Sequence, residues 1–522
     1  ALPSRPLSRR ATRLDLANAG TAEVVSAAMG LHPGDLELQR SGCSIFAVLG
    51  GDAASWERAA WARAGELLLS AMNTHRRDGP LLGSCCTAML GFARADGPSA
   101  EAHARYLFEA GSSAAVAAAL TEVAADMDPT GLGDACQFFA VLASRWAEPA
   151  VAAKLSDVGA HRAVIVAMLA APRALSLQLQ GCRAIVALLE IGHLAGTQEA
   201  SRSADVASEK ALLQSGACRA IVSCLNLGRA DPELQRAGCR AMLSLANLGG
   251  ENFLALIEAG GCAAVLAAAK MLVDDEAAQQ TCCSILALLP RGSAEAARAL
   301  VAGGACEVLA AAMLRFADAR ISRSACAALS HMRAVDGARE RLLLAGGQQA
   351  VLAAMATAPN DQDVQSCGSQ VLLAFLDSSA GGKVVLDIER LAAAVFSAAR
   401  CFPDDRSLRL SSTRMAICVA GKPSAPPQAC CVPVIAALHL APSDIEVWLQ
   451  GCWAALLHLR RGPAARRCWV EAGLCETMLA ALRGFPDVPE LQWVACAALV
   501  NASQGDAEGR RRLLAAGGSA EV

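Results

Sequence analysis

Aromatic residues and strong net charge are both lacking in this sequence of 522 residues. Aromatic side chains make up 4% of the chain, with one tyrosine among them, and the formal net charge is -3. A nearly neutral chain has no general attraction to nucleic acid or to an anionic membrane. No uninterrupted apolar run comes near the ~18 residues that a membrane span requires, and no strand-like alternation occurs. We therefore expect no nucleic-acid partner, no membrane span and no sheet.

Sequence motifs of the common enzyme classes are missing as well. There is no Gly-x4-Gly-Lys-Ser/Thr, no Gly-x-Gly-x-x-Gly, no Gly-x-Ser-x-Gly and no His-Glu-x-x-His. The histidines are scattered, and His331, His439 and His458 fall in predicted helices, where packing or surface roles are commoner than catalysis. We expect no catalytic residue and no cofactor, and hence no enzyme in this chain.

The 22 cysteines include no Cys-x-x-Cys pair, so the commonest zinc spacing is absent. Most of them occupy one fixed position in a helical pattern, where a free cysteine behaves as a small hydrophobic residue. Disulfides are rare in reducing compartments, so this usage favours an intracellular and cytoplasmic protein. We expect buried structural cysteines, no metal and no disulfide framework.

What the sequence does contain is a repeat. Its clearest copy covers residues 233–272, where two Gly-Gly pairs separate three helical stretches. The pattern Leu-Gln-x-x-Gly-Cys recurs at residues 38–43, 177–182 and 234–239, and looser copies bring the total to eleven. Successive copies are about 43 residues apart, a period typical of helical repeat arrays. Repeats of this kind bury a continuous core between neighbours.

The pattern resembles the armadillo repeat, in which a short first helix and a second helix after a glycine precede a long third helix. The Leu-Gln-x-x-Gly-Cys form is similar to the armadillo arrays of vacuolar armadillo scaffolds and of leucine-rich-repeat kinases. The resemblance implies an all-α, right-handed superhelical solenoid of about eleven three-helix repeats. It also implies that the third helices line a groove for partners.

We expect one solenoid over most of the chain, with four departures from the regular repeat. The predicted segments are a flexible lead-in at residues 1–12, a single solenoid at 13–522, a polar insertion at 192–208, a Pro-rich loop at 421–428 and an incomplete last repeat at 507–522. The insertion is either a tolerated loop or a regulatory one, since its hydroxyl side chains could accept phosphate. The incomplete last repeat predicts that the natural chain continues or that a partner covers this end.

Candidate partner-binding residues come from one position of the third helix. Counting from the leucine that opens the pattern, the residue six further on is mostly polar in the eleven copies, as a solvent-lined groove requires. Together with two neighbouring side chains, the candidates are Gln137, Arg183, Arg236, Arg240, Gln370, Arg414, Trp453 and Trp493. The arginines predict either a solvated helix face or a site for an acidic or phosphorylated segment. The tryptophans predict either a binding hot spot or buried packing.

Three functions follow from this pattern. The first is a non-catalytic scaffold or adaptor that binds protein or peptide segments along the third helices. The second is a regulatory armadillo arm of a larger multidomain enzyme, such as a kinase-type protein. The third, a nuclear-import cargo adaptor, is disfavoured, because import adaptors of this family carry a Trp with an Asn four residues on, and no Trp here is followed in this way. The sequence leaves the oligomeric state open.

Overall fold

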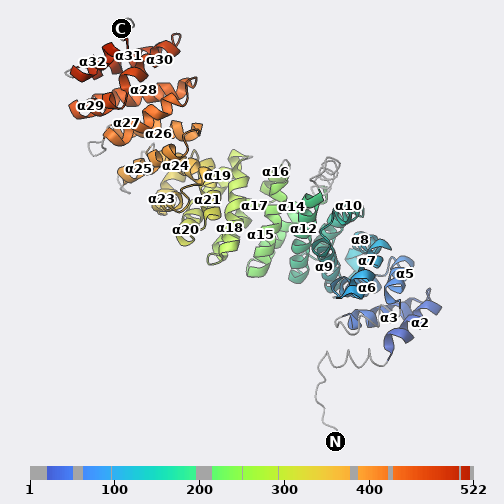
Figure 1. Ribbon diagram of the computed structural model, residues 1–522. Helices are drawn as coiled ribbons and strands as arrows, with labels where there is room; N and C mark the ends of the chain where they lie inside the picture. The colour runs from blue at the N-terminus through green and yellow to red at the C-terminus, as the bar shows by residue number, and fades with distance from the viewer. Residues whose placement is uncertain are drawn as a thin grey trace. The chain divides into compact units, whose positions relative to one another are not determined.

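The chain folds into helices arranged in successive repeats, as the computed structural model shows (Figure 1). The structure describes residues 20–50, 63–95, 97–195, 214–249, 251–291, 293–376, 386–420, 427–504 and 507–517. Within these ranges there is no strand. The predicted all-α fold is therefore confirmed. The chain divides into two compact units, Ala1–Leu272 and Val273–Val522, and each is described by itself.

The first unit contains the repeats up to the second helix of the sixth. Its helices are α2 (Thr21–Leu31), α3 (Leu36–Leu49), α5 (Ala64–Thr74), α6 (Gly79–Arg94), α7 (Pro98–Glu109), α8 (Ser112–Glu122), η1 (Ala124–Asp126), α9 (Pro129–Arg145), α10 (Pro149–Asp157), α11 (Ala160–Ala170), α12 (Leu175–Ala195), α14 (Ala217–Leu227), α15 (Pro232–Asn247), α16 (Glu251–Glu258) and α17 (Gly261–Met271). The third helices α3, α6, α9, α12 and α15 pack side by side in chain order.

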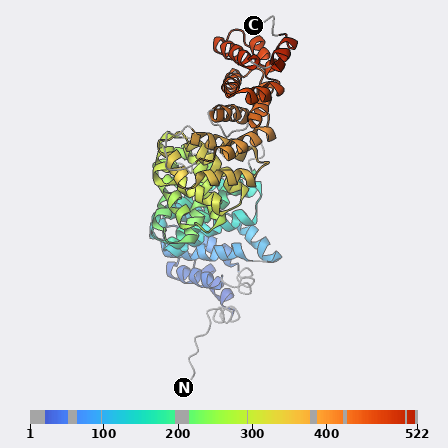
Figure 2. The ribbon, with the colours of Figure 1, turned by 90° about the vertical axis from the view of Figure 1, so that its left-hand side faces the viewer.

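The second unit begins with the third helix of the sixth repeat. Its helices are α18 (Glu276–Leu288), η2 (Leu289–Arg291), α19 (Ala294–Gly303), α20 (Ala305–Arg315), α21 (Ala319–Met332), α22 (Ala338–Leu344), α23 (Gly347–Thr357), α24 (Gln362–Leu376), α25 (Ile388–Cys401), α26 (Arg406–Ala420), α27 (Pro427–His439), α28 (Ile445–Leu459), α29 (Pro463–Glu471), α30 (Leu474–Gly484), α31 (Pro489–Ser503) and α32 (Ala507–Ala515). Here α18, α21, α24, α26, α28 and α31 form the layer of third helices. Figure 2 shows the last repeats, in orange and red, stacked in chain order.

Glycine makes the corner between the first and second helices of a repeat. Gly260 has φ 89° and Gly304 has φ 97°, a left-handed conformation that a side chain makes costly. The corner bends the chain by 73° between α16 and α17 and by 69° between α19 and α20. Among the described residues Arg63, with φ 57°, is the one non-glycine residue at positive φ, and it precedes α5 in the same way.

Aspartate begins most third helices. Asp231 accepts hydrogen bonds from the backbone N–H groups of Glu233 and Leu234, and so satisfies donors that have no partner inside α15. The same cap is found at Asp35, Asp78, Asp128, Asp275, Asp318, Asp361, Asp405 and Asp444. This aspartate was not recognised in the sequence pattern, although in nine of the eleven copies it lies three residues before the residue that opens the pattern.

The glutamine of the Leu-Gln pattern joins the third helix to the second. Gln235 is buried, and its Nε2 donates to the carbonyl oxygens of Leu225 at 2.7 Å and Gly228 at 3.1 Å. These carbonyls lie at the end of α14, where the helix offers them no donor of its own. Gln39, Gln178, Gln365 and Gln492 make the same two bonds in their own repeats. We call this arrangement the glutamine brace.

The glycine of the pattern lets the two helices approach. A Cβ added at Gly238 would lie 2.6 Å from a methyl carbon of Leu225, the residue whose carbonyl accepts from the brace. Equivalent overlaps occur at Gly42, Gly181, Gly368 and Gly451. The cysteine after this glycine is buried, as at Cys239, so the prediction of core cysteines is confirmed for most of the 22.

Two predicted boundaries are wrong by a few residues. The polar insertion was placed at 192–208, but α12 continues to Ala195, and residues 196–208 lie outside the described residues. The Pro-rich loop was placed at 421–428, but α27 begins at Pro427 because proline is well tolerated in the first turn of a helix. The lead-in at 1–12 also lies outside the described residues. In the incomplete repeat, α32 is the first helix, and the single solenoid over 13–522 stays a prediction.

Among the described residues, one helix has the length and composition of a membrane span. It is the window Leu175–Gly192 in α12, with a mean hydropathy of 1.2, and 61% of it is buried inside the fold. We expected no such segment because no uninterrupted apolar run in the sequence comes near the ~18 residues of a span. The apolar face of α12 instead packs against α9 and α15.

The glycine of the pattern can be tested with a matched pair in helical positions. Gly238→Ala should destabilise the first unit by about 1–3 kcal/mol, because the added methyl overlaps Leu225. Gly192→Ala has no atom within 4 Å and should be neutral or stabilising, by up to ~1 kcal/mol. Thermal unfolding followed by circular dichroism measures both. Equal effects of the two substitutions would show that the close approach is unimportant.

The brace can be tested in the same unit. Gln235→Ala removes the amide that donates to the carbonyls of Leu225 and Gly228 and should cost about 1–3 kcal/mol. Asn247→Ala, on the exposed side of the same helix, is the control and should change stability little. Hydrogen exchange of α14 and α15 should speed up only in the first variant. Unchanged exchange there would mean that the brace carries little of the local stability.

Candidate functional site

The position six residues after the start of the pattern lies at the surface in all eleven copies. We call the side of the third helices that carries it the helix-3 face. The residues, none of them buried, are Ser44, Thr87, Gln137, Arg183, Arg240, Ser284, Ala327, Gln370, Arg414, Trp453 and Ala497. The brace and the buried cysteine face the core on the other side of each helix. The predicted register therefore agrees with the structure.

The arginines of α12 and α15 are paired with carboxylates across the two helices. Arg183 donates to Glu233 at 2.7 Å, and Arg240 lies 3.6 Å from Glu190. Each helix thus offers one arginine and one glutamate to the other. Arg236 is exposed on the same face. Arg183 and Arg240 thus already have a counter-ion, which weakens the case for a strongly basic site here.

In exposed ion pairs of this kind, the arginine and the glutamate attract each other only weakly. The side chains of Arg183 and Arg240 are 44% and 63% exposed, so water and salt screen both pairs. Their net contribution is of the order of 0–1 kcal/mol each. A partner carboxylate could therefore replace Glu190 or Glu233 at little cost.

The remaining polar candidates are spread over distant repeats. Gln370 donates to the hydroxyl of Ser407 at 2.8 Å and so joins α24 to α26. Gln137 is half-buried on α9 in the first unit, whereas Arg414 is exposed on α26 in the second. The structure does not gather these three side chains into one site.

The two tryptophans lie against each other at the surface of the second unit. The ring centroids of Trp453 on α28 and Trp493 on α31 are 5.5 Å apart, with the planes at 55°. The Nε1 of Trp453 points to a carboxylate oxygen of Glu490 at 3.3 Å. Trp493 is 57% exposed, and Val500, two turns later on α31, is 46% exposed. We call Trp453, Trp493 and Val500 the tryptophan patch.

A third tryptophan, Trp448, is buried and has a structural role. Trp448 stands where other repeats carry the brace glutamine, and it is buried. Its Nε1 donates to the carbonyl of Ala441 at 2.9 Å, so it replaces one of the two brace bonds. Trp448 is thus a packing residue and Trp493 is exposed, and the binding hot spot stays a prediction.

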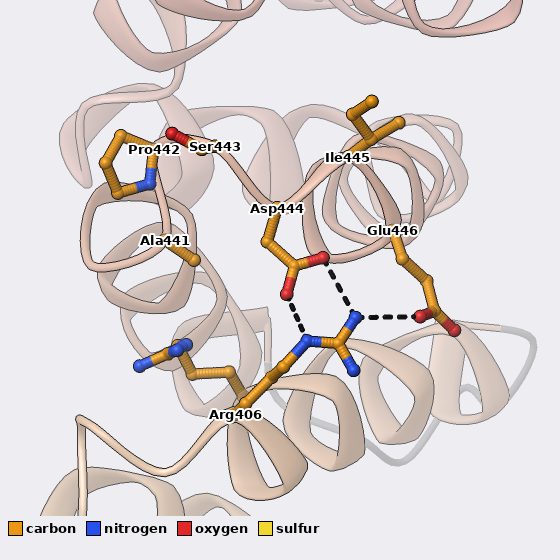
Figure 3. A pocket seen from close by; sticks show the side chains of 8 residues that line it. Arg406, Ala441, Pro442, Ser443, Asp444, Ile445 and Glu446 are labelled. Atoms are coloured by element: carbon orange, nitrogen blue, oxygen red, sulfur yellow. Dashed lines mark hydrogen bonds and ion pairs between the residues drawn. The ribbon is translucent and has the colours of Figure 1, made fainter.

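A ladder of arginine and aspartate along the third helices was missed from the sequence. Figure 3 shows Arg406 of α26 reaching Asp444, the cap of α28, and Glu446 beyond it, beside an open hollow of about 600 Å³. The hydrogen bond from Arg406 lowers the pKa of Asp444. Arg40 pairs with the cap Asp78 in the same way. The sequence signal that could have predicted these ion pairs is an arginine early in one third helix followed by a capping aspartate in the next repeat.

The buried polar groups have the chemistry of structural residues. His458 is fully buried, its Nε2–H donates to the carbonyl of Ala416 at 2.9 Å, and burial lowers its pKa to about 4. Burial raises the pKa of the Cys452 thiol to about 12, which suppresses the nucleophilic thiolate. Within the described residues no group of three or more His, Cys, Asp or Glu side chains could hold a metal.

Comparison with known proteins identifies the fold. No family model matches the chain, and no curated protein matches it. A solved structure that concerns a phosphorylation switch in the interaction between cadherin and beta-catenin is 13% identical, covers 97% of this chain and 98% of its own, and has a TM-score of 0.65. An engineered protein is 19% identical over 93% of this chain and 99% of its own, with a TM-score of 0.47.

The beta-catenin likeness supports an armadillo-like helical solenoid. At 13% identity it shows the fold and nothing of the function. The expected armadillo architecture is thereby confirmed at the level of the fold. The resemblance to vacuolar scaffolds and to leucine-rich-repeat kinases stays a prediction.

His458 should make the second unit sensitive to acid. Its folded pKa of about 4 lies below the ordinary histidine value, so the unfolded chain takes up a proton first as pH falls. The stability that neutral His458 provides should be present above about pH 6.5 and decline between 6.5 and 4, by about 3 kcal/mol in total. His458→Gln should flatten this decline in thermal melts, whereas His32→Gln, at an exposed position, should not. A decline of the same size in both variants would contradict the assignment to His458.

Proposed function

We propose that this chain is a non-catalytic protein-binding scaffold that takes segments of partner proteins on its helix-3 face. The observation that carries the proposal is the tryptophan patch. An indole that is 57% exposed beside a second indole is an unfavourable use of apolar surface unless a partner covers it. Tryptophan is also the residue most enriched at binding hot spots.

The repeat architecture supports this proposal. Where it occurs, the glutamine brace holds the third helix at one depth and rotation, so the helix-3 face presents its side chains at regular intervals. Side chains on this face do not have to fill the core, so they differ between repeats. Examples are the paired arginines of α12 and α15 and the tryptophans of α28 and α31. Regular spacing with variable chemistry suits recognition of an extended or helical segment.

The arginines of the first unit offer a second contact. Arg183, Arg236 and Arg240 lie on adjacent third helices and could bind an acidic or phosphorylated segment by exchanging Glu190 and Glu233 for its carboxylates or phosphates. Because the exchange replaces existing pairs, we expect this contact to be weaker than the one at the tryptophan patch.

The rival function is the regulatory arm of a larger multidomain enzyme. It uses the same helix-3 face, with an enzyme domain of the same chain as the partner. The full-length coding sequence separates the two functions, since only the rival requires a catalytic domain beside this one. A nuclear-import adaptor remains disfavoured, because neither Trp453 nor Trp493 has an asparagine four residues on.

Trp493→Ala tests the scaffold proposal directly. The full chain, wild type and variant, is used to capture proteins from cell extract with chemical cross-linking, and captured proteins are quantified by mass spectrometry. We expect partners that cross-link next to α28 or α31 to be reduced at least tenfold, since a hot-spot residue contributes about 2 kcal/mol or more.

The matched control is Leu344→Ser, which removes an apolar side chain that is 61% exposed on a first helix of the same unit. The control should capture the partners as the wild type does. Partners that survive Trp493→Ala, or that are lost equally in Leu344→Ser, would show that the helix-3 face is not the binding surface.

A further inference from the structure

Two arginines converge on the end of α31. Arg466 on α29 donates through Nη1 to the carbonyl of Gln504 at 2.5 Å, and Arg510 on α32 donates through Nη1 to the carbonyl of Ser503 at 3.1 Å. Residues 503 and 504 are consecutive, so the two guanidinium groups, from first helices of successive repeats, meet at one place. That place is the carboxyl end of the helix that carries Trp493.

Two further arginines border this place. Arg460 caps the carboxyl end of α28, the third helix that packs beside α31. It occupies the same position in its repeat as Gln504 does in the following repeat. Arg467 follows Arg466 on α29 and is exposed, as are Arg460 and Arg510. We call Arg460, Arg466, Arg467 and Arg510 the basic rim.

Among the residues that the structure describes, none of the four arginines of the basic rim forms an ion pair with a carboxylate, in contrast to Arg183 and Arg240 on α12 and α15. Arg466 and Arg510 donate to backbone carbonyls, which leave the formal charge of the arginines in place. The dipole of α31 offers about half a negative charge at this end, too little to balance four cations.

The basic rim lies at the end of the tryptophan patch. Along α31 the exposed side chains run from Trp493 to Val500 and then to the rim at residues 503 and 504. Leu457 on α28 is half-exposed, and it occupies the position in its repeat that Asn501, next to Val500, occupies in the following repeat. At the opposite end the carboxylate of Glu490 already accepts from Trp453. Along α31, toward its carboxyl end, the surface therefore changes from apolar at the tryptophan patch to cationic at the basic rim.

We infer that this surface binds a partner segment in which an apolar anchor residue is followed by carboxylates. The anchor covers Trp493 and Val500, and the carboxylates meet the guanidinium groups of the basic rim. Arginine binds carboxylate through two parallel hydrogen bonds, which gives direction as well as affinity. A basic segment would bring like charges together. The inference rests on the proposed function and adds to it the chemistry and orientation of the partner.

Three sets of labelled synthetic peptides, binding to the full chain and followed by fluorescence anisotropy, test this inference. Each set carries leucine or phenylalanine anchors, followed by glutamate in the first set, lysine in the second and serine in the third. The glutamate set should bind at least tenfold more tightly than the lysine set, and the difference should shrink as salt rises. Equal binding of the sets, or binding by none of them, overturns the inference.

Charge reversal locates the site. Arg460→Glu with Arg467→Glu spares Arg466 and Arg510, the two rim residues that donate to the end of α31, so the fold should persist, as circular dichroism will show. This double variant should weaken the glutamate set at least tenfold and favour the lysine set. Arg298→Glu, at an exposed position on the first helix α19, is the control and should have no effect. Equal losses in the double variant and the control overturn the inference.

The design separates this inference from the proposed function. If Trp493→Ala abolishes binding while rim reversal changes nothing, the scaffold proposal stands and the acidic partner is wrong. If the glutamate set binds with the same affinity to Trp493→Ala, the tryptophan patch is not the anchor and the proposed function fails at this site. Anionic lipid vesicles and single-stranded nucleic acid serve as further probes. Binding of either at the rim, as tight as that of the glutamate set, would show a general polyanion surface and overturn a protein partner.

Discussion

One glutamine side chain sets the position of the third helix in many of these repeats. Its amide donates to two carbonyls at the end of the second helix and so ties the third helix to the second. Three residues later a glycine lets the second helix approach, and the next residue is a buried cysteine. In two repeats another donor replaces the glutamine: Trp448 donates to the carbonyl of Ala441 and Arg409 to that of Pro403.

This constraint separates the two sides of the third helix. The inner side has to fill the space beside the second helix and supply hydrogen bonds to it, which restricts the residues that fit there. The helix-3 face is relieved of both demands, because its side chains meet water and the neighbouring repeat. The same position can therefore hold Arg183, Gln370 or Trp453 without disturbing the packing beneath it. A solenoid that binds proteins gains its specificity from that freedom.

Much of the fold was predictable because its causes are local and repeated. Leu234 and Gln235 recur with fixed neighbours, so their helix, its buried side and its exposed side could all be inferred from spacing. The limits of the insertion and of the Pro-rich loop were less predictable. The ends of α12 and α27 depend on how far packing and first-turn preferences extend a helix, and polarity alone underestimates both.

The candidate site was only partly predictable. Counting along the helix placed Arg183 and Arg240 at the surface, since it depends on local periodicity alone, but it left open whether Trp453 and Trp493 are exposed or buried. The counter-ions Glu190 and Glu233, and the meeting of the basic rim at the end of α31, join residues from different repeats. Such contacts depend on the offset between adjacent helices, which no single repeat encodes.

The sequence by itself determined the repeat, the all-α architecture and the side of each third helix that faces the solvent, because each follows from residue types at helical spacing. Only the tertiary structure decided which surface charges are neutralised and which remain. Arg183 and Arg240 meet glutamates across a helix pair, whereas Arg466 and Arg510 meet only carbonyls. The physical reason is that electrostatic pairing depends on distances of a few ångströms between side chains far apart in the chain.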